Sequence, residues 1–278
     1  MTTIHMTHRN RRRIAQFGLT ARGVLYGLIG VLAVQLALSG GGGGGGGGEQ
    51  TSQEGALRTL ASQGTWGTVL VGLIGVGLVG YALWRVTQFF IEKGAGEDSE
   101  TKRRIVRISY LVRALIYGAL AVAAFGIAFG SGGGGGGGSS EQTLTARVMR
   151  DVPAGRWLVG LVGLIIIAVG VYQAYQAFSD DFMDELQTHR MSRSERVWVR
   201  RLGGAGHAAR AVVYGLVGLF IVRAAVQFDP QEAVGLDGAL QSLASQPAGP
   251  WLLGLTALGL FAFGVYTVVR ARYVDVSE

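Results

Sequence analysis

Arg22-Gly23-Val24-Leu25-Tyr26-Gly27, which follows Arg12-Arg13-Ile14 after a short interval, is the stretch that decides the fold. The chain repeats this arrangement twice more, always with an arginine pair upstream and with an arginine and a tyrosine four residues apart. The other copies read Arg103-Arg104-Ile105 with Arg113-Ala114-Leu115-Ile116-Tyr117-Gly118, and Arg200-Arg201-Leu202 with Arg210-Ala211-Val212-Val213-Tyr214-Gly215. Each copy ends a basic segment and opens a long apolar one, so the chain is built from three tandem repeats.

The composition of the whole chain indicates a membrane protein. Of its 278 residues, 49% are hydrophobic and only 15% are charged, and the mean hydropathy is +0.35. Soluble domains carry about 25% charged residues. Each repeat holds two apolar stretches of roughly 20 to 25 residues, which as helices are long enough to cross a hydrocarbon core of ~30 Å. These spans are expected at about 19–38, 67–91, 108–129, 155–178, 206–227 and 249–269.

The predicted fold is an all-α membrane protein with six transmembrane helices, arranged as three tandem two-helix repeats in a pseudo-threefold bundle. The repeats are assigned to residues 1–95, 96–190 and 191–278. The second spans of the repeats align at Gly67, Gly155 and Gly249. Glycine is dense in the spans, and small residues allow membrane helices to approach closely. The glycines are therefore expected at helix–helix contacts.

Two glycine runs and a short leucine-bearing motif separate the spans within the repeats. The runs, Gly40–Gly48 and Gly132–Gly138, lack the lysine and hydroxyl ending of a phosphate-binding loop and are expected to be flexible linkers. The motif at Gly55–Gln63 recurs at Gly238–Gln246, with leucines three residues apart. This spacing predicts a short amphipathic helix on the outer face of the bundle.

One helix start is predicted from a local pattern. Ser192-Arg193-Ser194-Glu195 is a capping box, in which the serine and glutamate side chains each accept a hydrogen bond from the other's backbone N–H. The helix is expected to run through the arginine pair Arg200-Arg201 toward the fifth span.

The distribution of arginine and lysine predicts the orientation of the spans. The net charge is +7, and the basic residues concentrate before the odd-numbered spans and after the even-numbered ones, as the positive-inside rule describes. The loops on the other side hold only Arg58, Arg147, Arg150 and Arg156. Both termini are therefore expected in the cytoplasm. The cytoplasmic basic pairs are Arg12, Arg13, Arg103, Arg104, Arg200 and Arg201.

Several classes of chemistry lack the residues that they need. The chain has no cysteine, which excludes disulfides, thiolate nucleophiles and cysteine-based metal sites. No aspartate or glutamate falls within the six spans, whereas ion-coupled transporters usually rely on intramembrane carboxylates. No catalytic constellation, metal-ligand cluster or nucleotide fingerprint stands out. The protein is therefore expected to be non-enzymatic, with no cofactor, no metal and no nucleic-acid partner.

The repeated arginine and tyrosine are the candidate site residues. Because they are four residues apart, they share one helix face, about 6 Å apart along the axis. In one interpretation the arginine reaches the inner lipid headgroups, or binds main-chain carbonyls where the even-numbered spans end, while the tyrosine anchors at the interface. In the other, the three pairs face the repeat axis and surround a site for an anion. The candidate contacts with an anion or a lipid headgroup are Arg22, Tyr26, Arg113, Tyr117, Arg210 and Tyr214.

The repeated frame resembles a bacterial membrane family. Its elements are Arg-[Gly/Ala]-x-x-Tyr-Gly at the start of one span, a Gly-Ala-Leu helix, and Gly-x4-Gly-Leu at the start of the next span. Together they are similar to the family called domain of unknown function 1206, whose members carry tandem copies of a two-helix unit. The similarity extends from Arg12 to Tyr273, although the second copy lacks the Gly-Ala-Leu motif. The resemblance implies a multi-pass protein of the bacterial plasma (inner) membrane and implies no activity.

Two functions are compatible with these features. The first is a non-enzymatic envelope component that contacts anionic lipid or a partner protein through its basic cytoplasmic face. The second is a passive channel or transporter for a small anion or neutral solute along the axis of the three repeats. In that case Arg22, Arg113 and Arg210 would lie at its inner mouth.

Overall fold

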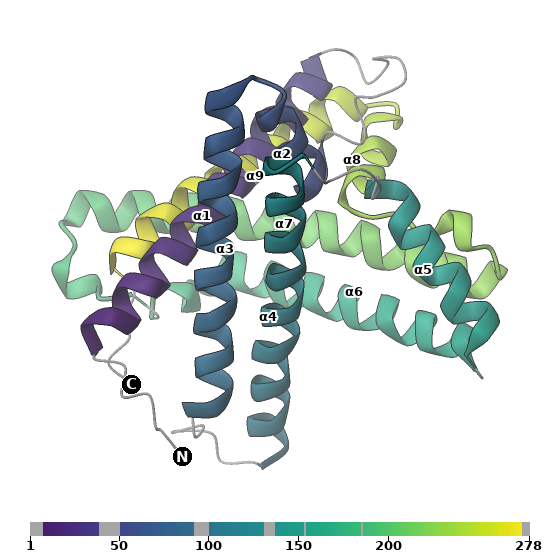
Figure 1. The fold of residues 1–278 in the computed structure, drawn as a ribbon, viewed down its shortest axis with the longest axis horizontal. Coiled ribbons are helices and arrows are strands. Elements are labelled where there is room, and N and C mark those ends of the chain that lie inside the picture. Colours follow the sequence, from purple (N-terminus) through teal and green to yellow (C-terminus); the bar gives the residue numbers. More distant parts are fainter. Residues whose placement is uncertain are drawn as a thin grey trace.

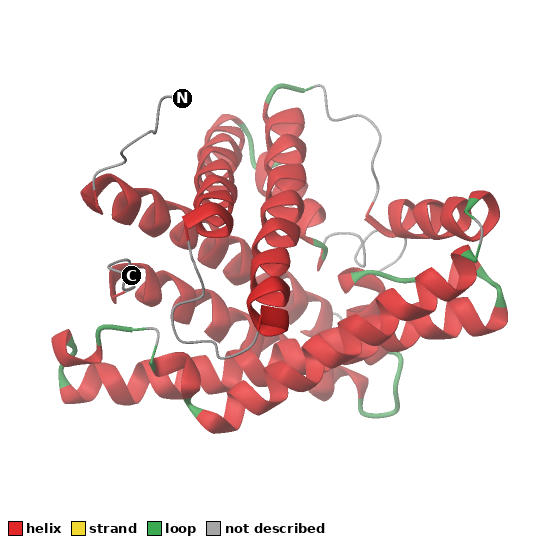
Figure 2. Cartoon of the chain, turned by 90° about the horizontal axis from the view of Figure 1, so that it is seen from below, coloured by secondary structure: helices red, strands yellow, loops and turns green. Residues whose placement is uncertain are grey.

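The computed structural model describes residues 8–38, 51–91, 100–130, 137–152, 154–184 and 186–273, which fold as helices joined by short loops (Figure 2). The run Gly40–Gly48 lies outside the described residues, as does most of the second glycine run, whose last two glycines begin helix α5. The six long helices are α1 (His8–Leu38), α3 (Thr65–Ile91), α4 (Glu100–Ala128), α6 (Gly155–Ser179), α7 (Arg193–Gln227) and α9 (Gly249–Tyr273). The shorter elements are α2 (Gln53–Ala61), α5 (Gly137–Asp151), α8 (Leu236–Ala244) and the 3₁₀ turns η2 (Asp181–Met183), η3 (Thr188–Arg190) and η4 (Pro230–Glu232).

Each of the six long helices is long and apolar enough to cross a membrane, which confirms the prediction of six spans in three two-helix repeats. The odd-numbered spans begin earlier than the apolar pattern indicated, because the basic segments before them are helical too. The capping box is confirmed at the start of α7. There the Ser192 hydroxyl accepts from the Glu195 N–H at 3.2 Å, and the Glu195 carboxylate accepts from the Ser192 N–H at 2.8 Å.

The spans associate in three antiparallel pairs, α1–α9, α3–α4 and α6–α7, which run in different directions in Figure 1. Each pair joins the second span of one repeat to the first span of the next, with the last repeat returning to the first. The pair α1–α9 also packs on α3 and on α7. Among the described residues, α4 and α6 make no comparable contact, so the threefold arrangement is open on that side.

Glycines set the close approach within the pairs, as the sequence predicted. A Cβ added at Gly264 of α9 would lie 2.5 Å from the backbone nitrogen of Gly27 in α1. A Cβ added at Gly218 of α7 would lie 2.8 Å from the carbonyl oxygen of Gly163 in α6. The two backbones therefore nearly touch in α1–α9 and in α6–α7, whereas in α3–α4 the glycine Gly75 lies against the side chains of Ala124 and Phe125.

The short helices α2 and α8 match the predicted leucine motif. Leu57 of α2 and the equivalent Leu240 of α8 are fully buried, while the opposite faces of both helices are more exposed. Helix α5 takes the corresponding place in the second repeat. In Figure 1, α2 and α8 lie away from the start of α1 and the end of α9. Because α1 and α9 are antiparallel, the start of α1 and the end of α9 lie on the same side of the molecule.

Candidate anion site where the six spans meet

The side chains of the three repeated arginine–tyrosine elements lie in different environments. Arg22 is only 8% exposed, and Tyr26 and Tyr117 are buried. Arg210 and its tyrosine, Tyr214, are partly buried, whereas Arg113 is exposed. Two of the three predicted arginines therefore point into the protein rather than toward lipid.

Arg22 is surrounded by aromatic rings from four helices. Its guanidinium carbon lies 5.4 to 5.7 Å from the ring centres of Tyr26, Tyr81, Tyr117 and Phe263. Its Nη1 donates a hydrogen bond of 2.9 Å to the Tyr81 hydroxyl. Its Nε is buried and has no hydrogen-bond partner among the described residues. Arg22 therefore retains an unused donor in the protein interior.

Arg85 of α3 is a second buried arginine, 5% exposed, that joins the first. Its Nε and Nη2 donate to the Tyr81 hydroxyl at 3.0 and 2.8 Å, and its Nη1 donates to the Gln88 side-chain oxygen at 2.7 Å. The Tyr81 oxygen thus accepts from Arg22 and Arg85 together. The Tyr81 oxygen is the acceptor that holds the two guanidinium groups side by side.

Arg210 of α7 completes the cluster from the opposite side. Its Nη2 donates to the Tyr214 hydroxyl at 2.7 Å. The Gln173 amide, oriented with its oxygen toward Arg210, accepts from Nη1 at 2.8 Å and from Nε at 3.3 Å. The Arg210 guanidinium lies 4.4 Å from the Phe263 ring and 5.6 Å from the Tyr26 ring. Tyr26 and Phe263 therefore separate Arg210 from Arg22.

All six spans contribute to this cluster, which we call the arginine–tyrosine centre. Its members are Arg22 and Tyr26 of α1, Tyr81 and Arg85 of α3, Tyr117 of α4, Gln173 of α6, Arg210 and Tyr214 of α7, and Phe263 of α9. The hydrogen-bond acceptors of its arginines are phenol and amide oxygens. The predicted binding of Arg22 and Arg210 to main-chain carbonyls was therefore wrong, because tyrosine side chains reach the guanidinium groups first.

The charges of the centre are not balanced by carboxylates. Among the described residues, ion pairs join Arg58 to Glu54, Arg200 to Asp180 and Arg223 to Glu232, all away from the centre. Ring faces and phenol oxygens stabilise a guanidinium only in part, at about 0.5 to 2 kcal/mol for each cation–π contact. The arrangement is therefore suited to hold an anion. No group of three or more metal-ligating side chains occurs in the described part of the chain.

A buried histidine lies beside the centre. His207 of α7 is 7% exposed, and its ring centre lies 5.1 Å from Phe182, 5.5 Å from Phe263 and 5.9 Å from Tyr266. Neither of its ring nitrogens has a hydrogen-bond partner among the described residues. Phe182 comes from η2, the turn after α6, and packs against Gly203 at a distance that leaves no room for a Cβ.

The sequence contains signals for members of the site that were not among the predicted site residues. Arg85, Gln173 and Thr267 each stand eighteen residues after the aligned glycines Gly67, Gly155 and Gly249, so they are equivalent positions of the repeat. Arg85 is also an arginine inside an apolar span, which by itself indicates a functional position. His207 stands three residues before Arg210 on the same helix face, where the other repeats have leucine and tyrosine.

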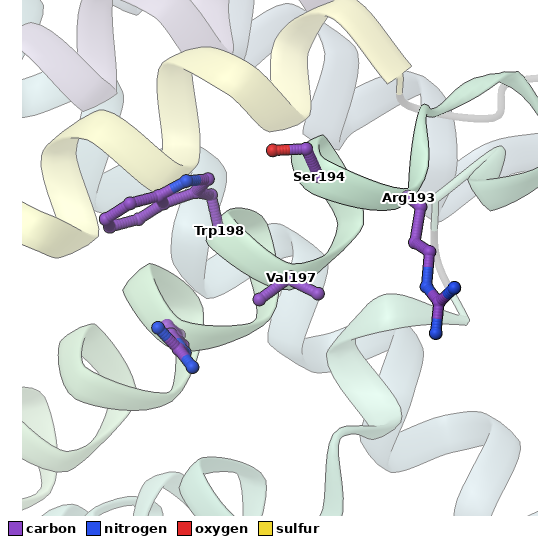
Figure 3. A pocket seen from close by; sticks show the side chains of 5 residues that line it. Arg193, Ser194, Val197 and Trp198 are labelled. Carbon is purple, nitrogen blue, oxygen red and sulfur yellow. The ribbon is translucent and has the colours of Figure 1, made fainter.

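The basic pairs lie apart from the centre. Arg13, Arg104, Arg200 and Arg201 are exposed, and Arg200 is paired with Asp180. Arg12 and Arg103 belong to α1 and α4, but their side chains lie outside the described part of the structure. The first turns of α7 form a shallow surface depression (Figure 3). Its lining residues are Arg193, Ser194, Val197, Trp198 and Arg201.

Comparisons with known proteins agree with the repeat structure. The family model described as Domain of Unknown Function (DUF1206) matches the chain three times, at residues 17–89, 108–180 and 205–274. The chain is also similar to the "Uncharacterized protein YxxB" of Bacillus subtilis (strain 168), with 34% identity over 262 residues, which is 94% of this chain and 90% of that protein. No solved structure matches the chain.

Proposed function

Because the chain belongs to the family described as domain of unknown function 1206, whose description states no activity, we propose a function from the geometry. The protein is a non-enzymatic membrane protein that binds a small anion at the arginine–tyrosine centre and provides a passive path for it, as a channel or carrier. The observation that carries this proposal is the burial of Arg22 and Arg85 around one phenol oxygen, with no ion pair from either among the described residues.

The cost of burying charge supports the proposal. Moving a charged side chain out of water costs several kcal/mol, and like charges that share a site add repulsion. Charges inside a membrane protein therefore usually mark the path or the binding site of an ion. An anion near Arg22 would offset the charge of the guanidinium groups and accept the hydrogen that its Nε does not otherwise share.

Anion binding and flux test the proposal directly. Purified protein in nanodiscs is titrated with sodium nitrate, sodium chloride and sodium phosphate by calorimetry, and proteoliposomes are assayed for uptake of the same anions. Arg22→Gln is expected to weaken anion binding about 10- to 100-fold, because hydrogen bonds to charged groups contribute about 1.5 to 3 kcal/mol, and to reduce uptake accordingly. Arg13→Gln, an exposed position on the same helix, is the matched control and should retain binding and uptake. No binding of any of the three anions, or equal binding by both variants, would contradict the proposal.

In this proposal both termini lie in the cytoplasm of a bacterial cell and the protein crosses the plasma membrane. The excess of arginine at the ends of the spans near His8 and Tyr273 supports this orientation. Because the chain has no cysteine, single substitutions give clean accessibility probes. In spheroplasts, Ser62→Cys is expected to react with an impermeant maleimide, whereas Ser194→Cys is expected to react only after lysis. The opposite pattern would reverse the orientation.

Contact between the basic cytoplasmic face and anionic lipid is a second candidate function. The observation that favours it is the depression at the start of α7, where the 60% exposed Trp198 lies between the exposed arginines Arg193 and Arg201. Tryptophan is enriched at membrane interfaces, and each arginine near an anionic surface contributes about 1 kcal/mol.

Lipid retention tests this second function. Native mass spectrometry of protein from mixed phosphatidylglycerol and phosphatidylcholine nanodiscs should show a preference for phosphatidylglycerol. The preference is expected to disappear when the basic pairs Arg12, Arg13, Arg103, Arg104, Arg200 and Arg201 are changed to glutamine. A control with Arg58, Arg147 and Arg150 changed to glutamine should keep the preference. An unchanged preference in the first variant would exclude the basic pairs as the lipid contact.

A further inference from the structure

We infer that His207 links anion binding at the arginine–tyrosine centre to the uptake of one proton, so that the anion and the proton bind together. The inference rests on the proposed function and deepens it, since it names a second species at the same site. It is carried by the position of His207 beside Arg210 and Phe263 and by the absence of hydrogen-bond partners for its two ring nitrogens in the described part of the chain.

The first step is that His207 and the arginines share one environment. His207 and Arg210 are three residues apart on α7 and therefore lie on one face of the helix. The Phe263 ring lies 5.5 Å from the His207 ring, 4.4 Å from the Arg210 guanidinium and 5.6 Å from the Arg22 guanidinium. One aromatic side chain thus touches all three groups, and an anion beside the arginines would lie within electrostatic reach of the imidazole.

The second step concerns the ring nitrogens. An imidazole offers one donor and one acceptor when neutral and two donors when protonated. Buried polar side chains nearly always have hydrogen-bond partners, and an exception needs an explanation, such as a functional role. His207 is 93% buried with both nitrogens unpartnered, since it is 7% exposed. An incoming anion would give the protonated ring a partner that the described protein groups do not provide.

The third step is the set of charged and titratable groups around the ring. Arg22 comes from α1, Arg210 from α7 itself, and Arg270 and Tyr266 from α9, and each arginine acts on the ring through its charge. The turn η2 contributes the uncharged Phe182. No carboxylate of the described residues belongs to this set. The described groups around the ring therefore supply positive charge, and an anion bound beside Arg22 and Arg210 would supply the negative charge that the imidazolium needs.

The fourth step is the coupling itself. A monovalent anion among the arginines attracts a proton to the imidazole lone pair, and the imidazolium in turn attracts the anion, since coupling between two ligands is reciprocal. The proton comes from water when the anion binds and returns to water when it leaves. One proton and one monovalent anion form a neutral pair. His207 would then do what an intramembrane carboxylate does in other proton-coupled proteins.

The experiment measures nitrate affinity of the full chain in nanodiscs between about pH 5 and pH 8, the range in which imidazoles titrate. Wild-type affinity is expected to rise as the pH falls, by about 5- to 150-fold in total, the usual size of a coupling between two sites. His207→Gln keeps a polar side chain that does not take up a proton and is expected to bind nitrate with no such pH dependence. His189→Gln, an exposed histidine, should keep the wild-type slope.

A second measurement does not depend on the folding of a variant. In a weakly buffered solution with a pH indicator, nitrate added to the wild-type protein should take up about one proton for each anion bound. Nitrate binding without proton uptake, or with the same affinity at every pH, would overturn the role of His207 and leave the anion site intact. If neither nitrate nor chloride nor phosphate binds at any pH, the proposed function fails, and the coupling fails with it.

Discussion

The helix pairs α1–α9 and α3–α4 carry the same repeated arginine in opposite environments. Arg22 of α1 is buried among four aromatic rings, whereas the equivalent Arg113 of α4 is exposed. One aligned position on the partner helix differs between the pairs. The aligned position holds Thr267 in α9 but Arg85 in α3, and the charge of Arg85 acts on Arg113.

This difference teaches that the repeat fixes the position of an arginine along the helix, whereas the neighbouring helices determine whether that arginine is buried. In α1–α9 the Thr267 hydroxyl donates a hydrogen bond to the Phe263 carbonyl, and Arg22 is the buried cation. In α3–α4 the interior holds Arg85, whose positive charge repels that of Arg113. The buried arginine of α3–α4 is therefore Arg85 of α3, whereas that of α1–α9 is Arg22 of α1.

The largest expected effect distinguishes the two equivalent arginines. Arg22→Ala should weaken nitrate binding about 10- to 100-fold, because hydrogen bonds to charged groups contribute about 1.5 to 3 kcal/mol. Arg113→Ala should change it by less than about threefold, since an exposed cation acts on the site only at a distance. Calorimetry on both variants in nanodiscs checks this. Equal losses would mean that Arg113 also enters the site and that the comparison between the pairs fails.

The packing of the two pairs should differ as well. Gly264→Ala places a Cβ against the Gly27 backbone nitrogen and is expected to destabilise the protein by about 1 to 3 kcal/mol, as overpacking does. Gly118→Ala in α4 and Gly27→Ala in α1 have no heavy atom within 4 Å of the new Cβ and serve as controls. Thermal unfolding in detergent measures all three. A neutral Gly264→Ala would show that the α1–α9 backbones can separate freely.

The bridge between the pairs is the Tyr81 hydroxyl. Tyr81→Phe removes the oxygen that Arg22 and Arg85 share and should cost about 1 kcal/mol, the usual net contribution of a hydrogen bond. Tyr117→Phe is the control, because Tyr117 contacts Arg22 and Tyr81 through its ring. The melting temperatures of the two variants are compared in detergent. If both fall equally, the rings rather than the Tyr81 oxygen hold the arginines together.

The smallest effect is expected for an arginine outside the centre. Arg200 forms an exposed ion pair with Asp180, and exposed ion pairs contribute little to stability. Asp180→Asn should therefore leave the melting temperature and the nitrate affinity close to those of the wild-type protein. A loss of nitrate binding in this variant would connect the loop after α6 to the centre.

Much of the fold could be predicted because it depends on local patterns. The six spans follow from length and hydropathy, and the repeat follows from the recurring arginine and tyrosine. The start of α7 at Arg193 follows from Ser192 and Glu195. The centre was harder to predict. Arg85 and Tyr81 lie on a helix whose partner could not be identified from spacing, because spans of the same repeat and spans of different repeats have similar apolar faces.

The sequence by itself determined the class of protein, the number of spans, the repeat and the positions of Arg22 and Tyr26 on one helix face. These properties depend on helix periodicity and on the cost of exposing polar backbone to lipid, and both are local. The tertiary structure alone decided that the second span of each repeat pairs with the first span of the next. It also decided that α4 and α6 make no comparable contact within the described residues, that Arg22 and Arg85 share the Tyr81 hydroxyl, and that Phe263 lies against Arg22, Arg210 and His207. Such choices depend on which glycine faces allow close approach and on which cations find a phenol oxygen, and only the assembled helices settle them.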